Sequence, residues 1–195
     1  DAEIAPPAIQ YELADRVQAT NAGGLGVIQQ MVKQLDLTES INRICPIFKM
    51  HLPYSEADHV LNIAYNLLAG GTCLEHLELR RKDEAYLNAL GAERIPDPTT
   101  AGDFCRRFST WDIFALQESF HEARLKVWKQ QPDSFFDQAI IEADGTQVET
   151  WGEHKEGMSI NYKGQWGYHP LVVTLANTRE LLYVWNRPGN RPSHE

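Results

Sequence analysis

The stretch Ala139-Ile-Ile-Glu142-Ala-Asp144-Gly145-Thr146 decides the fold, because an apolar run changes there into acidic residues and a glycine. Side chains alternate along a strand, so Glu142 and Asp144 share one face of a strand in this segment. A carboxylate at the end of a strand is open to a metal ion or a substrate, and its hard oxygen atoms suit Mg²⁺ or Mn²⁺. Asp-Gly between strand-like runs is also a common hairpin turn. In that case Asp144 would be present only because Asp adopts the backbone conformation of the turn. The residue types alone favour neither interpretation.

The residues after 135 have the pattern of β-strands. Their hydrophobic period changes from about four residues to about two, and β-branched and aromatic residues accumulate. We expect a buried strand over 136–143, a second strand over 168–176 and a third over 181–187. The segment Asn177-Thr-Arg-Glu180 has the length of a hairpin turn between the last two strands.

The residues from 24 to 130 have the pattern of helices. One face near the start carries apolar side chains at helical spacing, namely Leu25, Ile28, Met31, Val32 and Leu35. Ser55 and Asp58 have the spacing of a capping box, and the helix that they open is expected to end at Gly70-Gly71.

Three further helices are expected before the strands. The spacing of the leucines predicts a helix over 74–90 that ends at Gly91. Thr100 and Asp103 have the spacing of a cap that opens a short helix. A long amphipathic helix is expected over 111–130. The first two thirds of the chain are therefore predicted to be helical.

Length, composition and charge limit the class of protein. With 195 residues, of which 43% are hydrophobic and 23% charged, the chain can form a sizeable globular core. Its formal net charge of -9 argues against a nucleic-acid coat that works by bulk positive charge, but allows a local basic patch. No membrane span, signal peptide, disulfide framework or zinc motif is recognisable, so we expect a cytoplasmic chain without a membrane partner. The first residue is not Met, and we expect the sequence to be an excerpt from a longer chain.

An ordered series of short motifs follows the first strand: Asp144-Gly145-Thr146, Gly157, Asn161-Tyr162-Lys163-Gly164, Gly167-Tyr168-His169-Pro170-Leu171 and Arg187-Pro-Gly189-Asn190. A second series precedes it: Asn66 to Gly71, Leu74-Glu75, Asp83, Leu90-Gly91 and Pro98-Thr-Thr100 through Arg107-Phe108. Over residues 57–192 the chain resembles the DDE transposases of bacterial insertion sequences, in particular the group-1 DDE transposase domain. The order of the motifs is far more specific than any one of them.

The resemblance implies an α+β fold in which a mainly helical N-terminal region precedes the first three strands of a ribonuclease H-like sheet. We therefore expect an N-terminal extension over 1–23, a helical DNA-engaging region over 24–132 and the truncated start of the catalytic domain over 133–195. Because the core would be incomplete, we expect the third strand to have an exposed edge.

The resemblance also implies the chemistry. Members of the family hold two divalent metal ions, Mg²⁺ or Mn²⁺, with three acidic residues, cut a DNA strand at the transposon end and use the freed 3′-OH to attack target DNA. Asp144 matches the first catalytic and metal-binding Asp of the family. Glu142 matches no catalytic position and is left as a nearby supporting or solvent-facing carboxylate. The second Asp and the Glu of the family lie beyond a strand such as 181–187, so both ions are expected only in the full-length site.

The partner that the resemblance implies is DNA, both the terminal inverted repeats and the target, bound by a homodimer at the bacterial nucleoid. Lys163 and Arg187 lie beside glycine turns and are the best candidates for contact with DNA. Arg106 and Arg107 form a basic cluster in the helical half that could contact phosphates, although charged clusters are more often solvated helix faces. His169, within Gly-Tyr-His-Pro, is expected to be a structural hydrogen-bonding group near Asp144.

Two alternatives to a transposase stay open. One is a non-catalytic interaction module, such as a domesticated transposase remnant whose β segment completes a partner. The other is a metal-dependent nuclease of the same fold, which releases products by hydrolysis only. A further Asp and Glu downstream would separate the first alternative from a transposase, and strand transfer would separate the second.

The missing carboxylates give a first prediction. The 195-residue chain by itself is expected to bind two metal ions only weakly and to leave DNA uncut. The measurement is nicking of supercoiled plasmid by the purified chain with and without Mg²⁺. Nicking that depends on Mg²⁺ and on Asp144 would refute this expectation.

Overall fold

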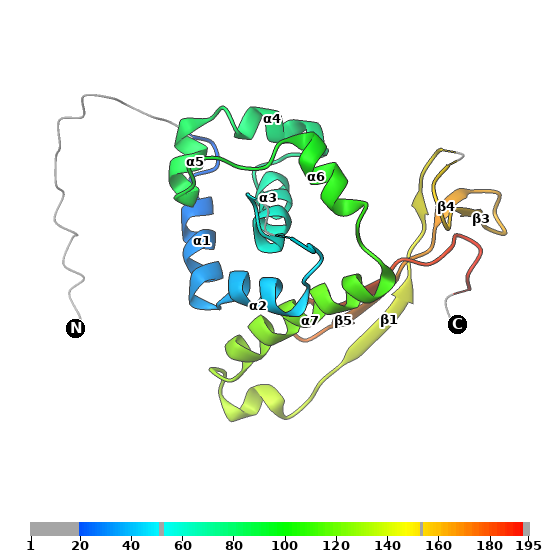
Figure 1. Cartoon of the computed structure of the whole chain (residues 1–195). Coiled ribbons are helices and arrows are strands. Elements are labelled where there is room, and N and C mark those ends of the chain that lie inside the picture. Colours follow the sequence, from blue (N-terminus) through cyan, green and yellow to red (C-terminus); the bar gives the residue numbers. More distant parts are fainter. Residues whose placement is uncertain (1–19, 51–52, 153, 193–195) are drawn as a thin grey trace, which may run out of the picture. The chain divides into compact units, whose positions relative to one another are not determined.

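The computed structural model describes residues 20–50, 53–152 and 154–192 (Figure 1). Most of the expected N-terminal extension, residues 1–19, lies outside the described residues. The described part contains seven α-helices and two three-stranded antiparallel sheets, so the predicted α+β class is confirmed. The chain divides into two compact units, and the boundary between Ile113 and Phe114 falls inside a helix.

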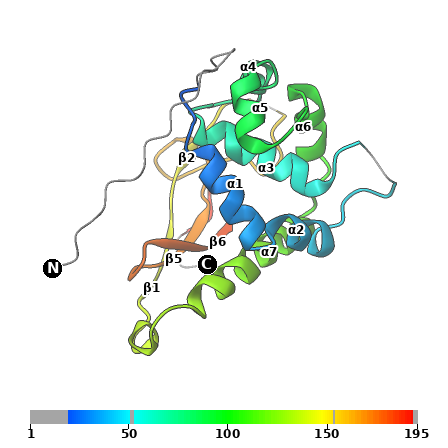
Figure 2. The same cartoon turned by 90° about the vertical axis from the view of Figure 1, so that its left-hand side faces the viewer.

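The first unit consists of short helices that follow one another closely in sequence. They are α1 (Leu25–Gln34), α2 (Leu37–Ile44), α3 (Glu56–Leu68), α4 (Leu77–Arg80), α5 (Glu84–Leu90) and α6 (Pro98–Cys105), with a short 3₁₀ turn η1 (Leu74–His76) before α4. Helix α3 lies among the others and contacts α2, α4 and α6 (Figures 1 and 2). Because it is surrounded, α3 is the natural centre of this unit.

The core of the first unit joins α1, α3 and α5. Its buried side chains are Leu25, Val32, Tyr65, Tyr86, Leu90 and Ile95. Burial raises the pKa of both tyrosines to about 12. The predicted apolar face of α1 is only partly inward, because Met31 is 50% exposed. The periodic pattern therefore identified the helix but not the full width of its buried face.

The helix starts show which capping predictions were right. The capping box of α3 is confirmed: Ser55 Oγ accepts from Asp58 N at 3.3 Å, and Asp58 Oδ2 accepts from Ser55 N at 2.8 Å. The predicted cap at Thr100 and Asp103 is wrong, because α6 begins earlier, at Pro98, and its cap is Asp97, whose Oδ1 accepts from Thr100 N at 2.9 Å. Pro98 occupies the first helical position, where its missing N–H costs nothing.

Two further helix predictions were incomplete. The expected helix over 74–90 is split, because α4 ends at Arg80 and Asp83 then caps α5 by accepting from Tyr86 N at 3.1 Å. Helix α2 lies in the region expected to be helical, but it was not predicted as a separate helix. It starts at Asp36, which has a left-handed φ of 51°, so no ordinary capping pattern marks its beginning.

A buried carboxylate attaches the loop after α2 to α3. Glu56 is 8% exposed, and its Oε1 accepts from the backbone N–H groups of both Ile47 and Phe48 at 2.8 Å. Buried N–H groups need an acceptor, and an ionised one forms the stronger bonds. Glu56 therefore fixes the path of the chain before the helix that it begins.

His59 of α3 lies in an aromatic cluster. Its ring stacks on Phe104 with a centroid distance of 4.5 Å, and Phe48 lies 5.6 Å from it. Only 2% of His59 is exposed, and burial lowers the pKa of its imidazole below the ordinary value. The neutral ring is thus the form that the folded unit accommodates.

The second unit contains two small sheets. The larger sheet has the order β1-β5-β6, formed by β1 (Ile141–Gly145), β5 (Leu171–Leu175) and β6 (Glu180–Trp185). The smaller sheet has the order β2-β4-β3, formed by β2 (Val148–Glu149), β4 (Trp166–Tyr168) and β3 (Ser159–Ile160). A 3₁₀ turn η2 (Asp133–Phe136) precedes β1.

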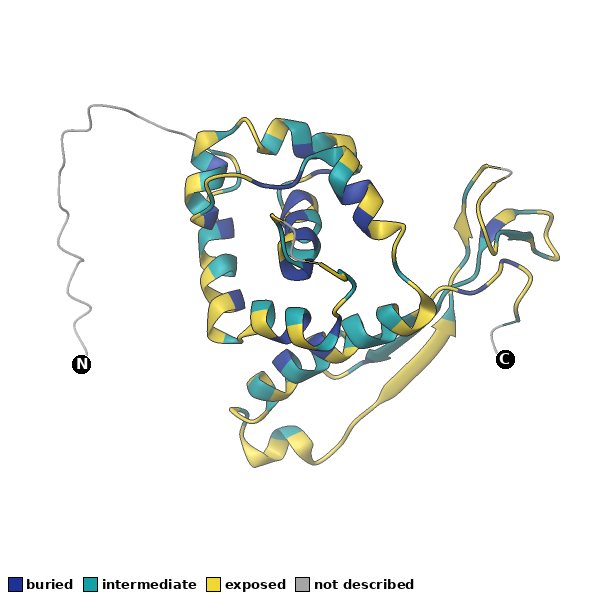
Figure 3. Cartoon of the chain, in the orientation of Figure 1, coloured by how far each residue is buried: buried dark blue, intermediate teal, exposed yellow. Residues whose placement is uncertain are grey.

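The predicted first strand differs from β1 in place and burial. Phe136 belongs to the 3₁₀ turn, so the strand begins five residues later than expected, at Ile141 instead of Phe136. It is also exposed along most of its length, as Figure 3 shows, with Ile141 62% accessible. Hydrophobic residues alone suggested burial, but no described element covers the faces of β1.

Helix α7 (Thr110–Trp128) holds the outer edge of β6. His121 Nε2 donates to Leu182 O at 2.7 Å, and Gln117 Oε1 accepts from Val184 N at 2.8 Å. Arg124 Nε bonds to Glu180 Oε2 at 3.1 Å. The third strand is an edge strand of the described sheet, as expected, but side chains of α7 take some of the hydrogen bonds that another strand would take.

Removing the carboxylate of Glu56 should destabilise the first unit. Glu56→Ala leaves two partly buried N–H groups without an acceptor, so we expect the free energy of unfolding to fall by about 2–3 kcal/mol. Urea unfolding followed by circular dichroism measures this, with the exposed Glu93 as a control. Glu93→Ala should change it by less than about 0.5 kcal/mol. Equal effects of the two variants would contradict the role given to Glu56.

The lowered pKa of His59 predicts a pH dependence of stability. Below the ordinary pKa the unfolded chain binds a proton that the folded chain excludes, so the free energy of unfolding should fall as the pH decreases from about 7.5 to about 5.5. His59→Phe keeps an aromatic ring next to Phe104 and should show a smaller decrease. His154→Gln, at an exposed site, should behave like the parent chain. An unchanged pH dependence in His59→Phe would show that His59 is not the titrating group.

Candidate functional site

Asp144 lies within β1, near the end of the strand. In the ladder between β1 and β5, Asp144 pairs with Val172 and Gly145 pairs with Leu171. The alternative that Asp-Gly forms a hairpin turn is therefore wrong, because both residues are strand residues. The Asp144 side chain is exposed, and its Oδ1 accepts from the N–H of Gly145 at 2.7 Å. One carboxylate oxygen is thus engaged locally, and the group faces solvent.

Glu142 lies two residues earlier on the same strand. It pairs with Thr174, and its side chain is also exposed. The alternation of β1 puts Glu142 and Asp144 on the same face, about 7 Å apart along the strand. The two carboxylates are therefore neighbours that differ in position: Asp144 is at the end of the ladder, and Glu142 is inside it.

The ring of His169 lies against the backbone of Gly145. A β-carbon at residue 145 would be only 2.3 Å from His169 Cε1, so a side chain there would displace the ring. The N–H of Thr146 donates to Pro170 O at 3.0 Å and keeps the two segments together. His169 therefore lies beside Gly145, the residue that follows Asp144.

Arg187 anchors the segment after β6. It is only 3% exposed, and its Nε donates to His169 O at 3.1 Å. In return, His169 N donates to Arg187 O at 2.9 Å. Through these two hydrogen bonds Arg187 joins the segment after β6 to the segment before β5, and its role in this structure is therefore structural. Its predicted contact with DNA stays a prediction.

A tight turn between β3 and β4 presents Lys163. Asn161 Oδ1 accepts from the N–H groups of Lys163 at 2.8 Å and of Gln165 at 3.0 Å. Gly164 has a φ of 79°, a left-handed conformation that glycine adopts without strain. The Lys163 side chain is exposed, with Nζ 5.5 Å from the ring centroid of Tyr162. The turn therefore displays a cation and an aromatic ring side by side.

A pocket of about 590 Å³ lies between this turn and residues 189–192. Gly145 and His169 line it, so it begins one residue from Asp144. Its other polar side chains are two cations, Lys163 and Arg191, and four amides, Gln147, Asn161, Gln165 and Asn190. No Asp or Glu is among the described residues that line it, although the whole chain has a net charge of -9. The pocket thus suits an anionic ligand.

The two arginines predicted in the helical half belong to the first unit. Both are exposed at the end of α6. Arg106 forms an ion pair with Asp103, and the guanidinium of Arg107 lies 5.6 Å from the ring centroid of Phe48. Their contact with DNA stays a prediction.

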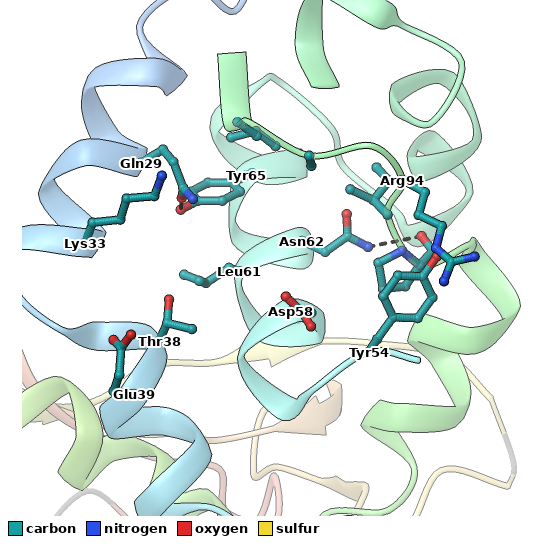
Figure 4. Close-up of a pocket in the computed structure, with 14 residues that line it drawn as sticks. Gln29, Lys33, Thr38, Glu39, Tyr54, Asp58, Leu61, Asn62, Tyr65 and Arg94 are labelled. Carbon is teal, nitrogen blue, oxygen red and sulfur yellow. Dashed lines mark hydrogen bonds between the residues drawn. The ribbon is translucent and has the colours of Figure 1, made fainter. Parts of the chain in front are cut away.

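A second pocket, of about 320 Å³, lies in the first unit between α1, α2, α3 and the 92–96 segment (Figure 4). The view shows Lys33 and Arg94 on different sides of it, with Asn62 between them. Asn62 Nδ2 donates to Pro96 O at 3.1 Å, and Tyr65 donates to Gln29. Asn62, Tyr65 and Gln29 therefore serve the packing of α3.

The described residues do not form a complete metal site. No group of three His, Cys, Asp or Glu side chains in the described part of the chain is placed to hold a metal ion together. The exposed oxygens of Asp144 have the chemistry that Mg²⁺ and Mn²⁺ prefer. Asp144 thus fits the role of one ligand, and the two-metal site that the resemblance implies needs carboxylates beyond those described.

Sequence reasoning missed the pocket beside Asp144. It singled out Lys163, but not Gln147, and Asn190 appeared only as the last residue of the motif Arg187-Pro-Gly189-Asn190. Asn161 appeared only within a glycine turn motif. The signal was weak because amide residues in turns are ordinary, and only the pairing of β4 with β2 and β3 brings these segments to one place.

Comparison with known proteins identifies the family. None of the helices in the described residues is long and apolar enough to cross a membrane. No curated protein and no solved structure is significantly similar to the chain. The family model described as transposase DDE domain group 1 matches residues 14–195, which is most of the chain. The chain therefore belongs to the group-1 family of transposase DDE domains.

Proposed function

We propose that the chain is part of a DNA transposase that cuts a strand at the transposon end and joins the freed 3′-OH to target DNA. The observation that carries this proposal is the position of Asp144, exposed at the end of β1 beside a pocket with two cations and no acid among its described lining residues. A DNA strand is a polyanion, and phosphate contacts from Lys and Arg position it. The family to which the chain belongs supports the same function.

The fold that supports this function is a ribonuclease H-like core begun by β1, β5 and β6. Their consecutive antiparallel pairing is compatible with such a start. Within the described residues α7 covers the edge of β6, whereas the outer edge of β1 pairs with no strand. Additional strands of the core would therefore pair with β1, next to Asp144. The proposed functional division is a helical DNA-engaging region over 24–132 and the start of the catalytic domain over 133–195.

Asp144 is proposed as a catalytic residue and as a ligand of one of two divalent ions, Mg²⁺ or Mn²⁺. In the complete enzyme such ions would stabilise the charge on the phosphodiester oxygens. Glu142 faces the same side but lies further inside the ladder, and we give it no catalytic role. Lys163 would contact the DNA backbone near Asp144. Arg106 and Arg107 would contact DNA in the helical region.

The proposed partners are the terminal inverted repeats and the target DNA, bound by a homodimer at the bacterial nucleoid in the cytoplasm. Two ends of one element must be brought together before joining, and a dimer supplies two catalytic sites for this purpose. A nuclease of the same fold would share Asp144 and the pocket but would release cut ends.

The test compares two carboxylates of one strand in the complete protein that carries this chain. Its substrate is DNA with a terminal inverted repeat, incubated with Mg²⁺ and a target plasmid. Asp144→Asn should lower both cutting and joining at least about 100-fold, because a metal ligand is lost. Glu142→Gln, an equally exposed change on the same face, should keep both within about 3-fold.

Electrophoresis of the products separates the remaining possibilities. Joined products support a transposase, and products that are cut but never joined indicate a nuclease. Full activity of Asp144→Asn would contradict the catalytic assignment. Absence of cutting by the complete parent protein would instead favour a non-catalytic interaction module.

A further inference from the structure

We propose that the pocket beside Asp144 is a subsite for a single nucleotide of an unpaired DNA strand. Lys163 and Arg191 would hold its phosphate, the ring of Tyr162 would stack on its base, and Gln147 and Asn190 would contact the edge of the base. This proposal rests on the proposed function and adds to it the form of the DNA at the site. Its chemical class of ligand is a nucleotide outside the duplex.

The size of the pocket fits one nucleotide. Its volume of about 590 Å³ lies within the range of about 300–1,000 Å³ in which proteins enclose small ligands. A duplex cannot enter a pocket of this size, whereas a base that has left the stack can. The cations provide the attraction for phosphate, since no carboxylate is among the described residues that line the pocket.

The amide side chains of the pocket have two different tasks. Asn161 and Gln165 hold the turn: Asn161 Nδ2 donates to Gln165 Oε1 at 3.0 Å, and Gln165 also donates to Glu149. Gln147 Nε2, by contrast, is buried without a hydrogen-bond partner among the described residues. Leaving a buried donor unpaired costs free energy, which a ligand with an acceptor recovers. Among the amides of the pocket that hold no turn, Gln147 therefore has a donor left for the edge of a base, and His169 Nδ1, which also lines the pocket, likewise has no hydrogen-bond partner among the described residues.

The aromatic ring of the pocket is unusually accessible. Tyr162 is 92% exposed and lies at the tip of the turn that Asn161 holds. An aromatic ring displayed on a rigid turn next to a lysine is the combination with which proteins bind single strands, because the ring stacks on any base. The hydrogen bonds of the turn already hold its backbone in place, so binding would cost less conformational entropy.

The other wall of the pocket is held equally firmly. A β-carbon at Gly189 would lie 2.4 Å from Ser159 O and 2.5 Å from Gly167 O, so this segment packs directly on the small sheet. Arg191 N donates to Pro188 O at 3.0 Å, which fixes the backbone that carries the second cation. The two walls are thus preorganised around the space next to Gly145.

The experiment measures the affinity of the 195-residue chain for three DNAs by fluorescence anisotropy at low ionic strength. The DNAs are a blunt duplex, the same duplex with a short single-stranded overhang, and the overhang duplex with one abasic overhang residue. We expect the overhang to bind about 10-fold more tightly than the blunt duplex, and the abasic residue to remove most of this gain. Equal affinity for all three, or no binding of any, would overturn the proposal.

Variants then assign the effect to the pocket. Tyr162→Leu and Gln147→Leu should each lower the preference for the overhang about 5-fold without changing the affinity for the blunt duplex. Tyr162→Phe, which keeps the aromatic ring, should retain the preference of the parent chain. Lys163→Gln should weaken binding of all DNAs, whereas Lys129→Gln, an exposed lysine of the same unit, should not. Unchanged circular dichroism excludes misfolding of the variants.

The outcomes separate this proposal from the proposed function. If the overhang preference is absent or survives both leucine substitutions, the nucleotide subsite is wrong even when Asp144 proves catalytic. If Asp144→Asn keeps full activity but the preference depends on Tyr162 and Gln147, the subsite stands and the catalytic assignment is wrong.

Discussion

The antiparallel ladder between β1 and β5 is the constraint on which the candidate site depends. Its register places Asp144 opposite Val172, and it ends at Gly145 opposite Leu171. A slip of one residue would turn Asp144 to the other face of the sheet. The same register brings Gly145 to the ring of His169, which fits only because residue 145 has no β-carbon. The position of one carboxylate thus follows from a backbone hydrogen-bond pattern.

The hydrogen bonds of α7 determine which edge of this sheet is closed. Gln117, His121 and Arg124 bond to backbone groups of β6, and Glu180 also accepts from Trp128 at 3.2 Å. A strand edge occupied in this way is less available to a further strand. Within the described residues neither β1 nor β6 has a strand on its outer side, but only the edge of β6 bonds to side chains of α7. The exposed side chains of β1 agree with this arrangement.

Local signals in the sequence predicted most of the elements. The capping box of Ser55 and Asp58, the helix stop at Gly70-Gly71 and the hairpin between β5 and β6 depend on residues close in the chain, and all are present. The errors have physical reasons. Asp83 competes as a cap inside an otherwise helical pattern, and the left-handed start of α2 has no capping signature. Burial of β1 could not be predicted, because it depends on what covers the strand.

The sequence by itself determined the α+β class, the family resemblance and Asp144 as the carboxylate at a strand end, because these depend on residue order and local periodicity. Only the tertiary structure showed that Asp144 belongs to a strand instead of a turn, since pairing with Val172 is a contact between distant residues. It alone assembled the pocket, whose walls come from residues 145–147, 161–169 and 189–192. Such a site has no signature in the sequence, because its parts meet only through the pairing of β4 with its neighbours and the packing of Gly189 on the small sheet.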